Sequence, residues 1–122
     1  MAYKEEHAER LRSMLWAAGA EFNQLKMMGS CCYKVDDKLC AGVVTEKESG
    51  EDLVLLRLGP EAVGKALEKP GVKPFQPGST PMKDYVLISE DHLVDDEAYA
   101  EWIALALAFN PLAKASKKRK KK

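Results

Sequence analysis

The sequence lacks the features that define several broad classes of protein. Its 122 residues contain no apolar run near the roughly 20 residues that a membrane-spanning helix needs. The N-terminus, Met-Ala-Tyr-Lys-Glu-Glu-His, has no apolar core of the kind that a signal peptide carries. We therefore expect a cytoplasmic protein that has no membrane partner. A hydrophobic fraction of 46% and a charged fraction of 31% are ordinary for one globular domain.

Cysteine and histidine are scarce. The three cysteines form no Cys-x-x-Cys pair, which argues against a disulfide framework and fits a reducing compartment. The two histidines, His7 and His92, belong to different predicted elements, and neither is spaced with a cysteine as in a metal site. We expect no metal site and no cofactor.

Enzymatic motifs are also missing. The sequence has no Gly-rich phosphate loop, no Gly-x-Ser-x-Gly elbow and no paired-carboxylate motif. One alternative stays open, because Cys31, Cys32 and Cys40 lie within ten residues and suit a thiol or redox protein. A cysteine nucleophile needs a nearby base, and His7 falls on an apolar helix stripe. The sequence therefore predicts a protein that is not an enzyme.

The net charge of zero conceals a division of charge. All nineteen acidic residues and twelve of the nineteen basic residues precede Lys114, so this body carries a net charge of −7. The last nine residues hold the other seven basic groups. We expect residues 1–112 to form the domain and residues 113–122 to be a disordered Lys-rich tail.

The apolar pattern predicts an α+β fold in two layers. An antiparallel sheet of about five strands has helices packed on it, with N- and C-terminal helices flanking the sheet. The predicted helices cover residues 3–18, 60–68 and about 95–110, and the predicted strands cover 21–28, 30–35, 38–46, 53–58 and 85–88. Four prolines and two glycines between Lys69 and Pro81 predict an irregular segment.

We expect Gly19 to stop the first helix, and Asp95 or a nearby residue to cap the last one. Each terminal helix has an apolar stripe at helical spacing. On the first, the stripe is Tyr3, His7, Leu11, Met14 and Ala18, with Ala8 and Leu15 beside it. On the last, one stripe is Ala98, Trp102, Leu105 and Phe109, with Tyr99, Ile103 and Ala106 beside it, and this width indicates burial against the sheet. Trp16 lies nearly opposite the first stripe. Either a neighbouring loop covers this tryptophan, or it is exposed at a subunit or partner interface.

The pair Asp36-Asp37 predicts a tight hairpin turn, because aspartate tolerates positive φ angles. A two-residue turn pairs Val35 with Lys38 and Tyr33 with Cys40. Cys31 and Cys40 then share a face of the sheet, and Cys32 points the other way. A turn one residue longer brings Cys32 and Cys40 together instead.

The basic groups are candidates for anion contacts. Arg57 interrupts an apolar strand and needs a partner, which is either a surface carboxylate or a bound anion. Clustered cations displace counterions from nucleic acid, and with no aromatic residue in the tail any binding there is independent of base sequence. The cations of the tail are Lys114, Lys117, Lys118, Arg119, Lys120, Lys121 and Lys122.

Several motifs together resemble the TfoX/Sxy N-terminal domain family, which is named for bacterial competence regulators. Lys26-Met27-Met28-Gly29 is similar to the family's Lys-Met-Phe-Gly motif. The chain departs from the family pattern at Met28, Ser30 and Asp84, where phenylalanine, glycine and glycine are usual. The resemblance continues through Cys32, residues 35–40, Gly42-Val43, Arg57-Leu58, Pro81-Met82-Lys83, Tyr85-Val86, Trp102 and residues 109–114.

The resemblance implies a two-layer α+β fold and a non-enzymatic role. The best-known members promote transcription of competence genes together with a cyclic-AMP receptor protein. They also carry a second, C-terminal domain, whereas this sequence resembles the N-terminal domain alone, so we expect a stand-alone domain. Lys26, Arg57 and Lys83 occupy family motif positions and form a hypothetical cluster for anion contacts.

Three hypotheses about function follow. The first is a regulatory or binding module that contacts nucleic acid or a transcription-associated protein, with a homodimer as a possible state. The second is a thiol or redox protein that uses the hairpin cysteines. The third is a protein-interaction domain, whose surface is Trp16 and an exposed sheet edge.

Overall fold

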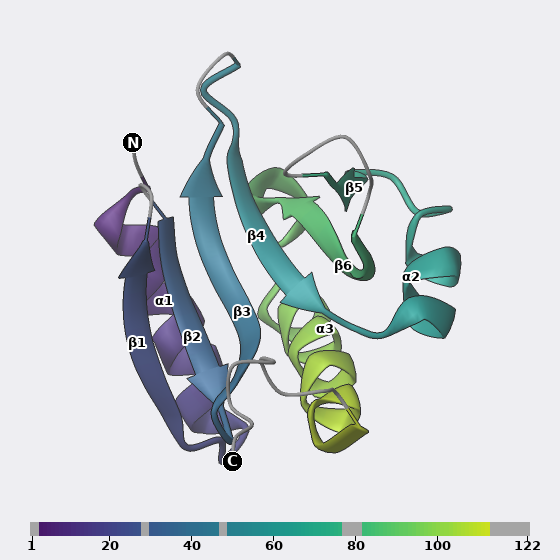
Figure 1. The fold of residues 1–122 in the computed structure, drawn as a ribbon. Coiled ribbons are helices and arrows are strands. Elements are labelled where there is room, and N and C mark those ends of the chain that lie inside the picture. Colours follow the sequence, from purple (N-terminus) through teal and green to yellow (C-terminus); the bar gives the residue numbers. More distant parts are fainter. Residues whose placement is uncertain (1–2, 28–29, 47–48, 77–81, 113–122) are drawn as a thin grey trace.

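A six-stranded antiparallel sheet and the helices packed against it form the two layers of the protein (Figure 1). The computed structural model describes residues 3–27, 30–46, 49–76 and 82–112. In chain order the elements are α1 (Glu5–Ala17), β1 (Phe22–Met27), β2 (Ser30–Val35), β3 (Lys38–Thr45), β4 (Asp52–Arg57), α2 (Pro60–Ala66), β5 (Val72–Phe75), β6 (Met82–Ser89), the 3-10 helix η1 (Glu90–His92), α3 (Asp96–Phe109) and the 3-10 helix η2 (Asn110–Leu112). The strand order is β1-β2-β3-β4-β6-β5. The predicted α+β class is confirmed, with helices at both ends of the chain.

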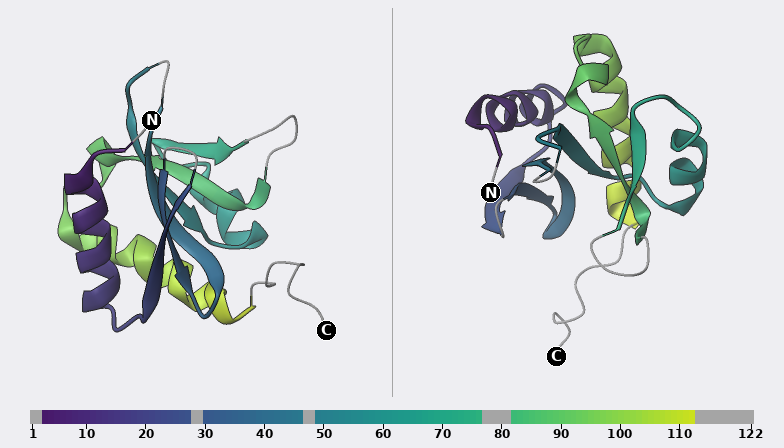
Figure 2. Two further views of the ribbon diagram at one scale, coloured as in Figure 1. Left: turned by 60° about the vertical axis from the view of Figure 1, so that its left-hand side comes forward. Right: turned by 90° about the horizontal axis from the view of Figure 1, so that it is seen from above.

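Alternation along the strands sends side chains to two different faces of the sheet. One face, together with α1 and α3, encloses the hydrophobic core. Figure 2 shows these two helices on the same side of the sheet. The sheet residues of this core include Cys31, Tyr33, Ala41, Val43, Val54, Leu56, Val86 and Ile88. The opposite face, which Figure 1 views, has neither of these helices on it.

The first helix buries Ala8, Leu11 and Leu15 against the sheet. The predicted stripe is therefore wrong in its centre, because Ala8 and Leu15 belong to the middle of the buried face and Met14 is only partly buried. The helix ends as predicted at Gly19, whose φ of +83° is a conformation that glycine adopts readily.

The last helix differs from its predicted stripe in the same way. Its buried residues are Tyr99, Ile103 and Ala106, whereas Leu105 is 46% exposed. The two stripes are adjacent on the helix surface, so the sequence pattern did not distinguish the face that meets the sheet from the face beside it. The predicted cap is confirmed, because the Asp95 carboxylate accepts a hydrogen bond from the backbone N–H of Glu97.

The β2–β3 hairpin has the predicted two-residue turn. Asp36 and Asp37 have φ angles of 57° and 65°, and Val35 pairs with Lys38. Further along, the prediction is wrong: a bulge shifts the register so that Tyr33 pairs with Ala41 rather than with Cys40. A bulge adds one unpaired residue to a strand, which alternation in the sequence does not reveal.

The segment between Lys69 and Pro81 is not wholly irregular. Its residues Val72–Phe75 form β5, which pairs with β6 at the edge of the sheet. An edge strand tolerates Pro74 because the missing N–H is not required on its outer side. With β5, the sheet has six strands, one more than the expected number of about five. Among the described helices, none is both long and apolar enough to cross a membrane.

Candidate functional site

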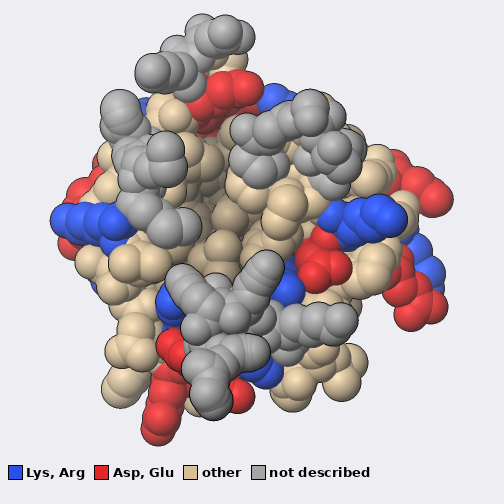
Figure 3. Space-filling view, in the orientation of Figure 1, with Lys and Arg blue, Asp and Glu red and all other residues tan. Residues whose placement is uncertain are grey.

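The sheet face away from α1 and α3 contains an apolar cavity of about 210 Å³. Figure 3 shows the middle of this face as a hollow of uncharged residues, with charged residues around its margin. The cavity lies over the central strands. Its principal lining residues are Cys32, Leu55, Phe75, Met82, Tyr85 and Leu87. Such a volume accommodates one or two large apolar side chains or a small apolar ligand.

Paired residues of neighbouring strands build this cavity. Cys32, Gly42, Leu55 and Leu87 follow one another across β2, β3, β4 and β6 in register. A Cβ atom at Gly42 would lie 3.1 Å from Cys32 Sγ and 3.1 Å from the backbone oxygen of Cys31. Glycine at this position therefore makes room for the Cys32 side chain in the floor of the cavity.

Arg57 adjoins the cavity beside Tyr85, its register partner on β6. Its guanidinium donates two hydrogen bonds to Asp84 Oδ2, at 3.4 Å from Nε and at 3.2 Å from Nη2. The guanidinium carbon lies 5.3 Å from the centre of the Tyr85 ring and 5.9 Å from that of Phe109. The Arg57 side chain is thus held by a carboxylate and two aromatic faces. Of the two predicted partners, the structure contains the carboxylate.

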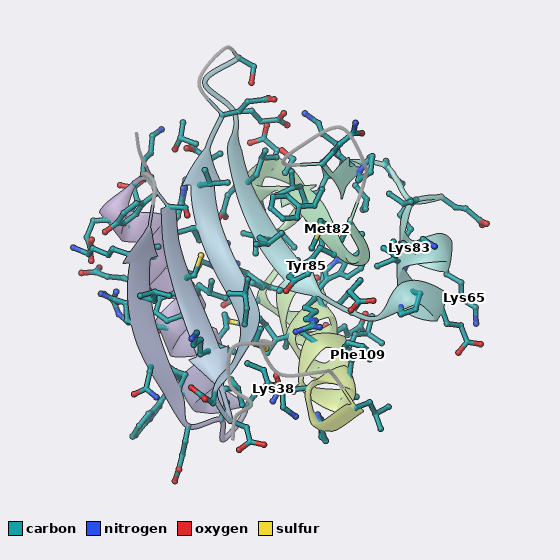
Figure 4. All side chains as sticks on the ribbon, viewed as in Figure 1. Lys38, Lys65, Met82, Lys83, Tyr85 and Phe109 are labelled. Carbon is teal, nitrogen blue, oxygen red and sulfur yellow. The ribbon has the colours of Figure 1, made fainter. Side chains whose placement is uncertain are left out.

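Lys38 and Asn110 connect the hairpin to the end of α3. Asn110 Nδ2 donates to the carbonyl of Val35 at 2.9 Å, and Lys38 Nζ donates to the carbonyl of Asn110 at 3.1 Å. Figure 4 shows Lys38, Tyr85 and Phe109 coming from β3, β6 and α3. Phe109 packs so closely on Gly59 that a Cβ there would lie 2.5 Å from its ring. These contacts fix the end of the sheet next to the cavity.

The two lysines and one arginine proposed as an anion-contacting cluster do not all lie together. Lys26 is in register with Cys31, Val43 and Val54, and these three belong to the helix-covered face. A hydrogen bond to Tyr3 is the main cause that raises the pKa of Lys26. Arg57 is three strands away on the cavity face, roughly 14 Å at ordinary strand spacing.

Lys83 lies on β6 next to Met82 and Asp84, with an exposed side chain that Figure 4 shows toward α2. Arg57 and Lys83 thus lie near one end of the cavity, and Lys26 does not join them. The predicted contacts from Lys114 to Lys122 lie outside the described residues.

Trp16 is 77% exposed, so the interpretation that a neighbouring loop covers it is wrong for the described structure. Arg12, one helical turn before it, donates a hydrogen bond to the side chain of Gln24 on β1 at 3.0 Å. Residues four apart share a helix face. Trp16 therefore lies on the side of α1 that borders β1.

All three cysteines are free and buried. Cys31 and Cys40 belong to the core, and Cys32 lines the cavity on the other face, as the two-residue turn predicts. Burial raises the pKa of the Cys32 thiol, and it raises the pKa of Cys40 to about 11. The thiolate is the reactive form, so these environments favour inert thiols over nucleophiles.

The histidines do not supply a base to these thiols. His7 Nδ1 lies 3.9 Å from Asp52 Oδ2, and the ring of His92 packs against Gly71. Among the described residues, no group of three His, Cys, Asp or Glu side chains is arranged to hold a metal ion.

Sequence reasoning missed the cavity itself. The run Leu53 to Leu58 is apolar on both faces of its strand, and that is the one signal in the sequence of an apolar second face. Met82 and Phe75 could not be assigned to it, because their positions depend on β5 and on the bulge before Phe75. The residues that line this one cavity come from five strands, β2 to β6.

The fold is that of a small α+β domain, with an apolar cavity on one face of its sheet. A comparison with protein-family models assigns the domain to a family. Residues 15–110 match the model of the TfoX N-terminal domain, and the chain belongs to this family. No curated protein matches the chain significantly.

Proposed function

We propose that this chain is a non-enzymatic regulatory module that binds a transcription-associated protein through the cavity face of its sheet. The observation that carries the proposal is the apolar cavity on the face that α1 and α3 leave uncovered. The family supports a role of this kind, because its N-terminal domain is generally not enzymatic.

The cavity is suited to an apolar anchor of the partner. Leu55 is 7% exposed and Tyr85 is 7% exposed, so the floor is packed, whereas Met82 at the margin is 43% exposed. An anchor side chain that fills the cavity would cover Met82 and displace water from an almost entirely apolar surface. The Arg57–Asp84 pair next to it supplies polar groups for the rim of such an interface.

The basic tail adds a second mode of contact in this proposal. The described chain ends at Leu112, directly after the helix end that Lys38 and Asn110 hold beside the hairpin. Seven cations follow within residues 114–122. They give general affinity for nucleic acid, with a log–log salt slope of up to roughly −6 on duplex DNA.

The test separates the two modes with matched variants of the full chain. Met82→Glu places a charge at the cavity margin, and Val94→Glu places the same charge at a residue that is 76% exposed away from the cavity. A third protein ends at residue 113. Each is used to capture partners from lysate, with and without nuclease.

We expect wild type and Val94→Glu to capture a protein that stays bound after nuclease treatment. We expect Met82→Glu to lose this protein. We expect the truncated protein to keep that partner and to lose most of its affinity for a short DNA duplex at low salt. Equal capture by Met82→Glu and wild type would overturn the cavity as the binding site. Unchanged duplex affinity after truncation would overturn the role of the tail.

A further inference from the structure

The strand β1 has an unpaired outer edge. It is the first strand in the sheet order, and among the described residues no strand pairs with its outer side (Figure 1). Val35 and Lys38 flank a two-residue turn and form a hydrogen-bonded pair, which fixes the alternation along β2. Through the register with β1, the outward N–H and C=O groups then belong to Phe22, Gln24 and Lys26. Such an edge is a template for another strand.

Two exposed apolar side chains lie along this edge. Leu25 is 39% exposed and projects to the cavity face, in register with Cys32. Trp16 is 77% exposed on the side of α1 that borders β1, one turn after the Arg12 contact to Gln24. The edge therefore offers apolar surface above and below the plane of the sheet.

The usual protection of an edge strand is weak here. Charged side chains, prolines and bulges normally discourage edge pairing, and Lys26 is the one charged residue in β1. Its ammonium group hydrogen-bonds Tyr3 of the same chain and lies near Glu5, and both raise its pKa. The charge is thus drawn to the helix face and away from Leu25.

We propose that β1 pairs antiparallel with β1 of a second copy, with Leu25 opposite the partner's Leu25 on a two-fold axis. This register pairs Gln24 of each copy with the partner's Lys26, so the outward backbone groups of these residues form four hydrogen bonds. It places no lysine opposite a lysine, because Lys26 faces a neutral amide. An isologous interface of this kind closes as a dimer.

The two-fold axis is perpendicular to the sheet, so each face continues into the same face of the other copy. The six strands become twelve, and the row from Leu25 through Cys32 to Leu55 continues across the axis. The two cavities then open on one side of the dimer. Both α1 helices lie on the other side, with each Trp16 turned toward the interface.

The first test is the oligomeric state of the full chain by sedimentation equilibrium. We expect a dimer for wild type and for Val94→Glu, and a monomer with an unchanged circular dichroism spectrum for Leu25→Glu. A wild-type protein that stays monomeric at several hundred micromolar would overturn the proposal. So would a Leu25→Glu dimer as tight as that of wild type.

The second test reads the register and does not depend on the stability of Leu25→Glu. Under mild oxidation, Leu25→Cys should form a disulfide-linked dimer at least tenfold faster than Asn23→Cys, which lies on the same face and edge. The three native cysteines are buried and do not compete. Equal rates for the two variants at the same concentration would contradict the proposed pairing.

Discussion

The side-chain amide of Asn110 donates a hydrogen bond to the backbone carbonyl of Val35 at 2.9 Å, and so ties the end of α3 to the hairpin turn. Asn110 is 5% exposed, and its contact spans 75 residues of sequence. Val35 precedes the turn that leads to Lys38, and Asn110 directly follows Phe109. This single bond therefore helps to fix the end of the sheet next to the cavity.

Replacing Asn110 with alanine removes this hydrogen bond and leaves the Lys38 bond to the Asn110 backbone in place. We expect the free energy of unfolding to fall by about 1–2 kcal/mol. Urea denaturation of Asn110→Ala measures the change, with Leu112→Ala, 76% exposed in the same segment, as the control. A loss no larger than that of Leu112→Ala would contradict the assignment.

The Arg57–Asp84 pair should be energetically coupled. The Arg57 side chain is 14% exposed and that of Asp84 is 29% exposed, so water screens the pair only in part. We expect a coupling energy of about 1 kcal/mol from a double-mutant cycle with Arg57→Met and Asp84→Asn. Additive effects of the two substitutions would show that the aromatic contacts alone hold Arg57.

Gly42 should resist replacement because of its closeness to Cys32. In Gly42→Ala the new methyl group would lie 3.1 Å from both Cys32 Sγ and the Cys31 backbone oxygen. We expect a loss of about 1–3 kcal/mol in the free energy of unfolding. The loss should be smaller in a Cys32→Ala background, which removes the sulfur. An equal loss in both backgrounds would mean that the thiol does not limit the space.

The three thiols should be unreactive in the folded protein. Burial raises the pKa of Cys32 and of Cys40, the latter to about 11, so at pH 8 both are protonated as well as shielded. We expect an aromatic disulfide reagent to modify all three cysteines only after denaturation. Fast modification of one cysteine in native protein would revive the thiol hypothesis.

Glu90 should make stability depend on pH. Burial raises its pKa above the ordinary 4.5, against the opposing charges of His7 and Arg10. Its Oε2 is buried and has no hydrogen-bond partner among the described residues. Because the pKa of Glu90 is raised in the folded state, its contribution to the free energy of unfolding is full below about pH 4.5. This contribution is lost as the pH rises through the folded-state pKa.

Glu90→Gln cannot ionise, so its free energy of unfolding should rise relative to that of wild type between pH 4 and pH 7. Denaturation curves at several pH values in this range give the difference. A difference that shrinks with rising pH would contradict this sign.

Much of the fold follows from local sequence signals. The Asp36-Asp37 turn, the Asp95 cap and the stop at Gly19 each depend on the conformational preference of one or two residues, and all three were predicted. The predictions that failed depend on tertiary context. The shift of Cys40 out of register arises from a bulge, and β5 forms despite Pro74 because it lies at an edge.

The candidate site was harder to predict than the fold. Lys26 and Arg57 both occupy motif positions, but motif membership does not tell which face of a sheet a side chain occupies. The bulge in β3 and the edge strand β5 decide which apolar residues meet in the cavity. Asp84 was noted as a departure from the family pattern, and the structure makes it the partner of Arg57.

The central claim is that a partner protein binds over the cavity. The most direct measurement takes the partner that stays bound after nuclease treatment and determines its affinity for wild type, Met82→Glu and Val94→Glu. We predict that Met82→Glu weakens binding at least tenfold, or about 1.4 kcal/mol, and that Val94→Glu stays within twofold of wild type. Equal affinities for all three proteins would contradict the claim.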